Sequence, residues 1–329
     1  MEYRKLGASG LLVSPITLGT MTFGEPVADT DAIKLVHGAM DLGINFVDTA
    51  NVYEGYKRIL GSPGGTAEEI VGKALVGRRD QVVLATKVGA PVGPGPQDRG
   101  LSTSHILREL DRSLKRLQTD YVDLYIIHWP DKFVPLEMTL AAMDTAVQAG
   151  KIRYFGASNH NAAQLCEMLW LADRNGWPRV VSSQIPFSLL RREFHHDLEF
   201  CERHDIGVTP YQPLQGGLLT GKYSRGQSPP SDSRAAEKPQ WMWEFGDELF
   251  DRIEGIDSLA AEAGVPAAQY ALAWARQQKA MSSLVVGVKS MQQIQDAVDS
   301  LSVSVPDDHL ERIDEVSPLP WQQPDPMRG

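Results

Sequence analysis

Residues 81–128 contain the pattern that decides the fold: QVVLATK (81–87), then STSHILRELDRSLKRLQ (102–118), then YVDLYIIH (121–128). The first and last runs are short, apolar and rich in β-branched or aromatic residues, as expected for buried strands. The middle segment repeats apolar residues at helical spacing and predicts an amphipathic helix. A strand, a helix and a second strand in this order predict a parallel βαβ unit.

The same alternation continues through the rest of the chain. Eight apolar runs occur, most of them separated by helix-period segments. They are ITLGT (16–20), INFVDT (44–49), QVVLATK (81–87), YVDLYIIH (121–128), IRYFGAS (152–158), RVVSSQI (179–185), IGVTPY (206–211) and SSLVVG (282–287). Eight βα units close into a barrel, whereas five or six favour an open sheet. We therefore predict an α/β protein with a (β/α)8 TIM barrel, forming a single domain over residues 1–329.

Segments outside these units have predicted places in the barrel. YRKLGASGLLVSP (3–15) has a turn between two extended pieces, which predicts an N-terminal hairpin that plugs the barrel floor. Long loops over residues 54–65, 88–100 and 212–246 follow the second, third and seventh runs. They belong at the carboxy-terminal face, where barrel active sites lie. We expect the tail beyond Pro306 to fold over that same face.

Composition excludes several classes of protein. The net charge of −10 gives no basic footprint for nucleic acid. No run of 18 apolar residues predicts a membrane span, and the N-terminus has no signal-peptide pattern, so we expect a cytoplasmic protein. The His195–His196 pair lacks the spacing of a metal site, and no metal is expected. The oligomeric state is left open.

Four residue types suited to carbonyl chemistry gather at successive strand ends. Asp48, Lys87 and His128 end the second, third and fourth runs, and Tyr53 lies one turn beyond Asp48. Neighbouring parallel strands are about 5 Å apart, so these side chains can converge. Each residue alone is equally consistent with an ordinary ion pair or a rim aromatic.

The four residue types together can reduce a carbonyl group. The oxygen of a carbonyl that receives hydride must also receive a proton, and Tyr53 is the candidate donor. Free tyrosine has a pKa near ~10, and an adjacent ammonium is expected to lower it. Asp48 would hold Lys87 charged and oriented, and His128 would orient the carbonyl oxygen or assist proton transfer.

The sequence resembles the aldo-keto reductases, specifically their potassium-channel β-subunit-like and bacterial branch. The resemblance runs from Leu6 to about residue 300, and five segments between residues 44 and 223 carry it. They are INFVDTANVYEG (44–55), VVLATKVG (82–89), DYVDLYIIHWPD (120–131), IRYFGASNH (152–160) and PYQPLQGGLLTGKY (210–223). The resemblance implies a (β/α)8 barrel, the catalytic tetrad Asp48, Tyr53, Lys87 and His128, and an extended NADP(H) cofactor, with NAD(H) as the alternative.

The resemblance also assigns residues to the nicotinamide and pyrophosphate parts of the cofactor. Ser158, Asn159 and Gln184 would bind the carboxamide, Tyr211 would stack on the nicotinamide, and Thr20, Met21 and Asp48 would border its ribose. The residues implied along the pyrophosphate are Pro213, Leu214, Gln215, Gly216, Lys222 and, clasping from above, Arg234.

The adenosine end corresponds to VVGVKSMQQIQDAV (285–298). Lys289 and Ser290 are implied to bind the 2′-phosphate, beside Gly287, although Lys289 is equally explained as a solvated helix-start lysine. Gln293 and Asp296 would face the adenine. Related chains often have Glu-Asn where this chain has Asp296 and Ala297, and the missing amide leaves the cofactor preference less defined.

Substrate contacts are the least defined part of the prediction. The 54–65 loop is longer than the usual connection in the family and brings Lys57 and Arg58 near Tyr53. It either shapes the pocket for a hydroxylated or anionic substrate or is a plain surface insertion. Trp129 either lines the pocket or packs against a neighbouring helix.

The activity expected from these features is NADPH-dependent reduction of an aldehyde or ketone, with sugar-like carbonyl compounds among the candidate substrates. An NAD(P)+-dependent sugar or alcohol dehydrogenase would use the same residues in reverse. The third alternative is a slow-turnover cofactor-binding regulatory module like the channel β subunits. The histidine at position 128 argues against it, because that lineage lacks a histidine there.

Overall fold

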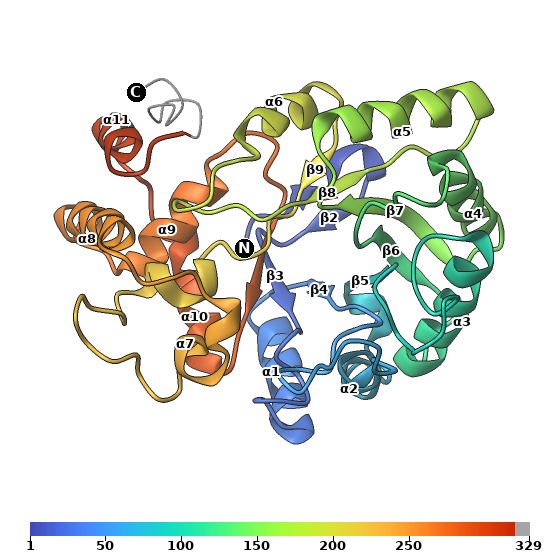
Figure 1. Ribbon diagram of the computed structural model, residues 1–329, viewed down its shortest axis with the longest axis horizontal. Coiled ribbons are helices and arrows are strands. Elements are labelled where there is room, and N and C mark those ends of the chain that lie inside the picture. The colour runs from blue at the N-terminus through green and yellow to red at the C-terminus, as the bar shows by residue number, and fades with distance from the viewer. Residues whose placement is uncertain (320–329) are drawn as a thin grey trace.

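A computed structural model describes residues 1–319 and shows the predicted barrel. Eight parallel strands lie in the order β10-β3-β4-β5-β6-β7-β8-β9, with helices around them (Figure 1). These strands are β3 (Ile16–Gly19), β4 (Phe46–Asp48), β5 (Val83–Val88), β6 (Val122–Ile127), β7 (Ile152–Ser158), β8 (Ser182–Gln184), β9 (Gly207–Val208) and β10 (Leu284–Gly287). Bridges from Val208 to Met281 and from Tyr211 to Val285 join the first and last strands of this order. The prediction of a (β/α)8 barrel is confirmed.

The helices pack their apolar faces on the outside of the strands. In α3 (Thr103–Leu117), for example, Ile106, Leu110 and Leu114 repeat at four-residue spacing and are buried. The other helices are α1 (Asp29–Asp41), α2 (Thr66–Ala74), α4 (Leu136–Gln148), α5 (Ala162–Asn175), α6 (His195–Arg203), α7 (Arg234–Glu237), α8 (Asp247–Glu262), α9 (Ala267–Arg276), α10 (Met291–Asp299) and α11 (Asp307–Val316).

The N-terminal hairpin closes the floor of the barrel, as predicted. Its strands β1 (Arg4–Lys5) and β2 (Leu12–Val13) pair antiparallel. Leu6 and Val13 are fully buried and share a core cluster with the inward-facing Phe46, Leu124 and Ile126. The hairpin therefore fills the end of the barrel opposite the strand carboxyl ends.

One predicted strand is much shorter than its apolar run. The run over residues 206–211 forms a strand only at Gly207–Val208. Pro210 has no N–H to donate, so the ladder cannot continue through it. Pairing resumes only as the isolated bridges of Tyr211 with Pro186 and Val285.

The three long loops lie at the carboxyl ends of their strands, as predicted. The third contains short helices: α7 and 3-10 segments at Gln215–Thr220 and Pro239–Trp241. Of the tail beyond Pro306, α11 packs against α8, and the Ser317 carbonyl accepts a hydrogen bond from Arg192 Nη1 at 2.6 Å in the loop after β8. Residues 320–329, the rest of the tail predicted to fold over the carboxy-terminal face, lie outside the described residues.

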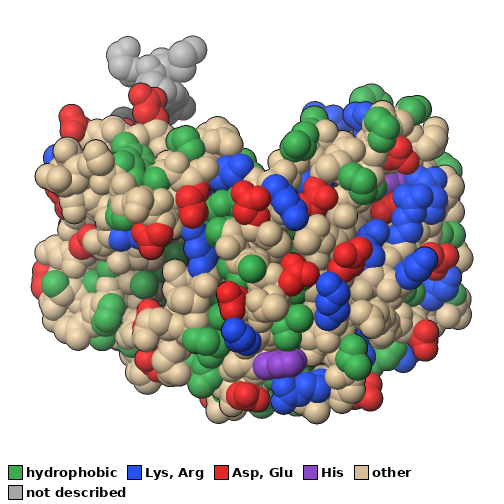
Figure 2. Space-filling view, turned by 90° about the horizontal axis from the view of Figure 1, so that it is seen from below, with side chains coloured by type: hydrophobic (Ala, Val, Ile, Leu, Met, Phe, Trp, Pro, Cys, Tyr) green, Lys and Arg blue, Asp and Glu red, His purple; other side chains and the backbone are tan. Residues whose placement is uncertain are grey.

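Charges of both signs are mixed on the face seen from below (Figure 2), and no continuous basic patch covers it. Across residues 1–319, no helix has both the length and the apolar character needed to span a bilayer.

Candidate active site

The tetrad is built from the inward-facing positions of three neighbouring strands. Side chains two residues apart on a strand point to the same face. Phe46, Ala85 and Ile126 face the barrel interior, and the next inward-facing residues on these three strands are Asp48, Lys87 and His128. Each of these three residues is therefore the last inward-facing residue of its strand, at the carboxyl end of the barrel.

Lys87 is the centre of the cluster. Its side chain is fully buried, and its ammonium donates to the Asp48 carboxylate, to the Thr49 carbonyl at 2.9 Å and to the Tyr53 hydroxyl at 3.1 Å. The ammonium also lies 4.7 Å from the centre of the Tyr53 ring. Three donors thus meet three acceptors, which fixes the orientation of the phenol.

His128 completes the cluster beside the phenol. Its ring meets the Tyr53 ring edge-on, with 6.0 Å between ring centres, and stacks on Trp129 at the same separation. Its Nδ1 is buried and has no hydrogen-bond partner among residues 1–319. Trp129 is 51% exposed and covers the His128 ring on the solvent side.

Burial and charge set the protonation states of these groups. Burial raises the pKa of Tyr53 above its ordinary value, and the opposing effect of the Lys87 ammonium only partly offsets this. The Lys87 ammonium lowers the pKa of Tyr53, as expected, but burial outweighs this effect and leaves the pKa above its ordinary value. Asp48 and Tyr53 raise the pKa of Lys87 in spite of its burial. Burial, together with the Lys87 charge, holds the pKa of His128 well below its usual range.

In this arrangement, the phenol retains its proton at neutral pH, the lysine is charged and the imidazole is neutral. Such a site can donate one proton to a basic oxygen at the barrel mouth and recover it through Lys87. A neutral histidine can donate a hydrogen bond to that oxygen without adding charge.

A second group of polar side chains crosses the barrel. Gln184 Nε2, on β8, donates to Asp48 Oδ2 at 3.1 Å. Asn159 has a left-handed backbone (φ 62°), and its amide nitrogen donates to Ser158 Oγ and to the His128 carbonyl at 2.9 Å. The Tyr211 hydroxyl donates to Asn159 Oδ1 at 2.8 Å. The Asn159 backbone N–H donates to the Gln184 carbonyl at 3.0 Å, so the residues predicted for the carboxamide and ring of a nicotinamide form one connected network.

Thr20 and Met21 follow β3 at the same face. Thr20 is buried, and its hydroxyl donates to the Asp48 carbonyl at 3.0 Å. This hydrogen bond joins the end of β3 to the end of β4, where Asp48 lies.

The long loop after β9 contains a glycine turn, where its Lys222 and Arg234 lie near Lys289 of the β10–α10 turn and form a cationic cluster. Gly216 and Gly217 have φ of 67° and 99°, and a Cβ at Gly217 would lie 2.7 Å from the Lys222 ammonium. Burial, then the positive charges of Lys289 and Arg234, lower the pKa of Lys222. Three mutually repelling cations beside an open backbone have the donor chemistry that phosphate groups require. Pro213, Leu214 and Gln215 lead into this turn, and Gln215 accepts from Ser188 Oγ at 3.3 Å.

The adenosine residues predicted from the resemblance lie at the β10–α10 turn. Ser290 caps α10 by accepting from the Gln293 backbone, and Gln293 Oε1 accepts from the Lys289 backbone at 2.7 Å. The Lys289 ammonium donates to the Asp232 carbonyl at 2.9 Å and pairs with Glu237. Asp296 accepts from the neighbouring Gln292, and Gly287 has open space around its α-carbon.

The two cations of the 54–65 loop are placed differently from each other. Arg58 bonds to Glu54, to Ser62 and to the Pro91 carbonyl, and so fastens this loop to the 88–100 loop. Lys57 is exposed, and no hydrogen bond or ion pair connects its side chain to the described residues. Neither side chain joins the tetrad.

Sequence reasoning missed Tyr56, which is 3% exposed and contacts Arg234, Trp241 and Lys289. Its only sequence signal is a second tyrosine three residues after Tyr53. Nothing in the sequence pairs it with residues nearly 180 positions later.

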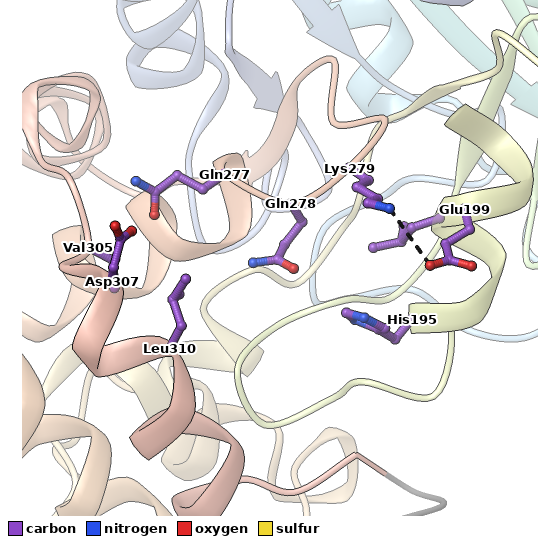
Figure 3. Close-up of a pocket in the computed structure, with 9 residues that line it drawn as sticks. His195, Glu199, Gln277, Gln278, Lys279, Val305, Asp307 and Leu310 are labelled. Atoms are coloured by element: carbon purple, nitrogen blue, oxygen red, sulfur yellow. Dashed lines mark ion pairs between the residues drawn. The ribbon is translucent and has the colours of Figure 1, made fainter. Parts of the chain in front are cut away.

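Two hollows lie apart from the tetrad. One, of about 490 Å³, lies between α6 and α11, where Gln278 points inward between His195 and Leu310 (Figure 3). The other, of about 530 Å³, lies between α2 and α3 and is lined by cations. Its Arg112 and Arg116 are already paired with buried Glu109 and Glu68, so much of its charge is compensated.

Comparison with known proteins agrees with this geometry. The model of the aldo/keto reductase family matches residues 15–318. The chain belongs to the aldo/keto reductase family. It is 36% identical to a probable voltage-gated potassium channel subunit beta of Arabidopsis thaliana, over all of both chains.

Two bacterial relatives carry enzyme names. Over 97% of both chains, this aldo/keto reductase is 34% identical to the uncharacterized oxidoreductase YrpG of Bacillus subtilis (strain 168). It is 32% identical to the L-glyceraldehyde 3-phosphate reductase of Escherichia coli (strain K12), over 92% of this chain and 88% of the relative. Family membership and these relatives support an oxidoreductase that uses a nicotinamide cofactor.

Proposed function

We propose that the chain is an NADPH-dependent reductase that converts an aldehyde or ketone to an alcohol, with Tyr53 as general acid. The observation that carries this proposal is the buried Lys87, which holds the Asp48 carboxylate and the Tyr53 phenol at once. A bound NADPH supplies the hydride that adds to the carbonyl carbon. Tyr53 donates its proton to the carbonyl oxygen, and neutral His128 steadies that oxygen with a hydrogen bond.

Lys87 has the role of stabilising the phenolate left after proton transfer. Its ammonium is 3.1 Å from the phenol oxygen and remains paired with Asp48 throughout. The negative charge that develops on Tyr53 is therefore met by a cation already in place, which avoids reorganisation of solvent during the reaction.

The cofactor choice rests on the cationic cluster. Lys222 and Arg234 lie beside the Gly216–Gly217 turn and would hold the pyrophosphate, and Lys289 would hold the 2′-phosphate of NADPH. The Asn159, Gln184 and Tyr211 network would receive the nicotinamide. Oxidation of an alcohol or sugar with NADP+ would use the same residues in the reverse direction.

The proposal is tested by following NADPH absorbance with a panel of aldehydes, ketoses and aromatic ketones. We expect cofactor oxidation with at least one carbonyl compound, together with NADPH binding in its absence. Binding of NADPH without turnover of any compound on the panel would contradict the reductase proposal.

That second outcome would favour the other candidate, a cofactor-binding regulatory module. The potassium channel subunit among the relatives supports this candidate. Turnover of a carbonyl compound distinguishes the two functions, because a regulatory module needs the cofactor site but no rapid proton transfer from Tyr53.

A further inference from the structure

Tyr56 connects the loop that carries Tyr53 to the cationic cluster. Its backbone N–H donates to the Glu25 carbonyl at 2.7 Å. Gly55, just before it, has φ of 66° and packs so closely on Glu25 that a Cβ would lie 2.1 Å from that carbonyl oxygen. The position of the Tyr56 ring is therefore fixed by the backbone on one side of the cluster.

The ring itself contacts two cations from distant parts of the chain. Arg234 Nε donates to the Tyr56 hydroxyl at 3.3 Å, and the guanidinium carbon lies 5.9 Å from the ring centre. The Lys289 ammonium lies 5.3 Å from the same centre. Trp241 meets the ring edge-on, with 5.4 Å between ring centres.

Holding these cations together has an electrostatic cost that an aromatic ring can reduce. Arg234, Lys289 and Lys222 carry like charges within reach of one another. A carboxylate such as Glu237 also attracts Lys289, but its negative charge would oppose a phosphate group. The π-face and hydroxyl of Tyr56 attract both cations and carry no net charge.

We propose that Tyr56 is a positioning residue of the cofactor site, which holds Arg234 and Lys289 ready for the phosphate groups of a dinucleotide. The inference rests on the proposed function, because it requires NADP(H) as the ligand. Tyr56 acts through the two cations, and its role is in phosphate recognition and not in proton transfer.

The test compares Tyr56→Phe and Tyr56→Leu with the unaltered protein by fluorescence titration with NADPH and with NADH. Tyr56→Phe loses only the Arg234 hydrogen bond, so we expect the NADPH Kd to rise about threefold. Tyr56→Leu loses both cation contacts, and we expect a rise of about tenfold. In Tyr56→Leu the NADH Kd should rise less, because NADH lacks the 2′-phosphate that Lys289 would bind, whereas in Tyr56→Phe both Kd values should rise alike. In both variants kcat at saturating NADPH should stay within about twofold.

Tyr121 provides a matched control. Its ring also contacts two cations, with Arg79 at 4.3 Å and Arg153 at 4.4 Å, but it directly precedes β6 at the opposite end of the barrel. Tyr121→Leu should leave both Kd values unchanged. In the double variant Tyr56→Leu/Lys289→Ala, the NADPH Kd should rise less than the product of the two single effects.

Each outcome has a distinct meaning. An unchanged NADPH Kd in Tyr56→Leu, or equal weakening of NADPH and NADH in that variant, overturns the inference while the proposed function stands. If the unaltered protein binds neither dinucleotide, the proposed function fails and this inference fails with it. If Tyr56→Leu does not fold, as judged by its circular dichroism, Tyr56→Phe decides instead, and an unchanged NADPH Kd in that variant overturns the inference.

Discussion

Lys87 shows how a single buried charge can define the chemistry of this site. A fully buried ammonium is costly unless it is paired, and here it has a carboxylate, a carbonyl and a phenol as partners. The same burial that would destabilise an unpaired lysine keeps water away and holds Tyr53 protonated. The Lys87–Asp48 pair is therefore better explained by function than by stability.

Lys289 gives a test of cofactor preference at the residue scale. In Lys289→Ala we expect the ratio of the NADH Kd to the NADPH Kd to fall about tenfold, because one charge-assisted contact to the 2′-phosphate is lost. Fluorescence titration with both cofactors measures this ratio. If the ratio does not change, the 2′-phosphate is recognised by other residues.

At the scale of elements, the alternation of strands and helices predicted the barrel. It also predicted that Asp48, Lys87 and His128 converge. Those residues belong to consecutive strands, so local order already implied their proximity. The contacts of Tyr56 with Arg234 and Lys289 were not predictable, because loop conformation brings them together across the sequence. The anchoring role of Arg58 was hidden for the same reason, since its partners lie on another irregular loop.

The hairpin gives a stability prediction for an element. Gly7 has φ of 50°, and a Cβ there would lie 2.4 Å from the Val181 carbonyl oxygen, whereas Gly10 has φ of 76° and nothing within 4 Å. We expect Gly7→Ala to lower the free energy of unfolding by at least about 3 kcal/mol and Gly10→Ala by about 1 kcal/mol. Urea unfolding measures both, and equal losses would mean that the hairpin does not pack tightly in solution.

The 54–65 loop gives a second prediction at this scale. Arg58→Ala removes the bonds to Glu54, Ser62 and the Pro91 carbonyl, so we expect proteolytic cleavage within residues 54–65 to become several-fold faster. Lys57→Ala is the control and should leave the cleavage rate unchanged. If Lys57→Ala instead changed kcat/KM across the carbonyl panel while Arg58→Ala left the loop intact, the loop would act by contacting substrate.

For the whole molecule, the barrel converts sequence order into a functional face. The hairpin fills one end, the tetrad occupies the other, and the loop after β9 together with the β10–α10 turn brings Lys222, Arg234 and Lys289 close to one another. A net charge of −10 makes this local cluster necessary for any anionic cofactor.

Buried histidines predict how stability depends on pH. Burial lowers the pKa of His105, His128 and His160, so below about pH 6.5 the unfolded chain binds more protons than the folded one. The free energy of unfolding should therefore decline as pH falls from 7 to 5, each histidine adding at most about 1.4 kcal/mol per pH unit. Urea unfolding of His128→Gln should show a shallower decline, and an equal or steeper one would contradict the assigned neutral state of His128.

The most direct test of the central claim is the turnover of Tyr53→Phe, measured as NADPH oxidation with the best carbonyl substrate. The substitution removes the proton donor, so we expect kcat to fall at least about 100-fold. It leaves the aromatic ring in place, so the NADPH Kd should stay within about twofold. Tyr121→Phe, which removes a hydroxyl far from the tetrad, should retain full activity. Retention of more than about a tenth of kcat in Tyr53→Phe would contradict its role as the proton donor.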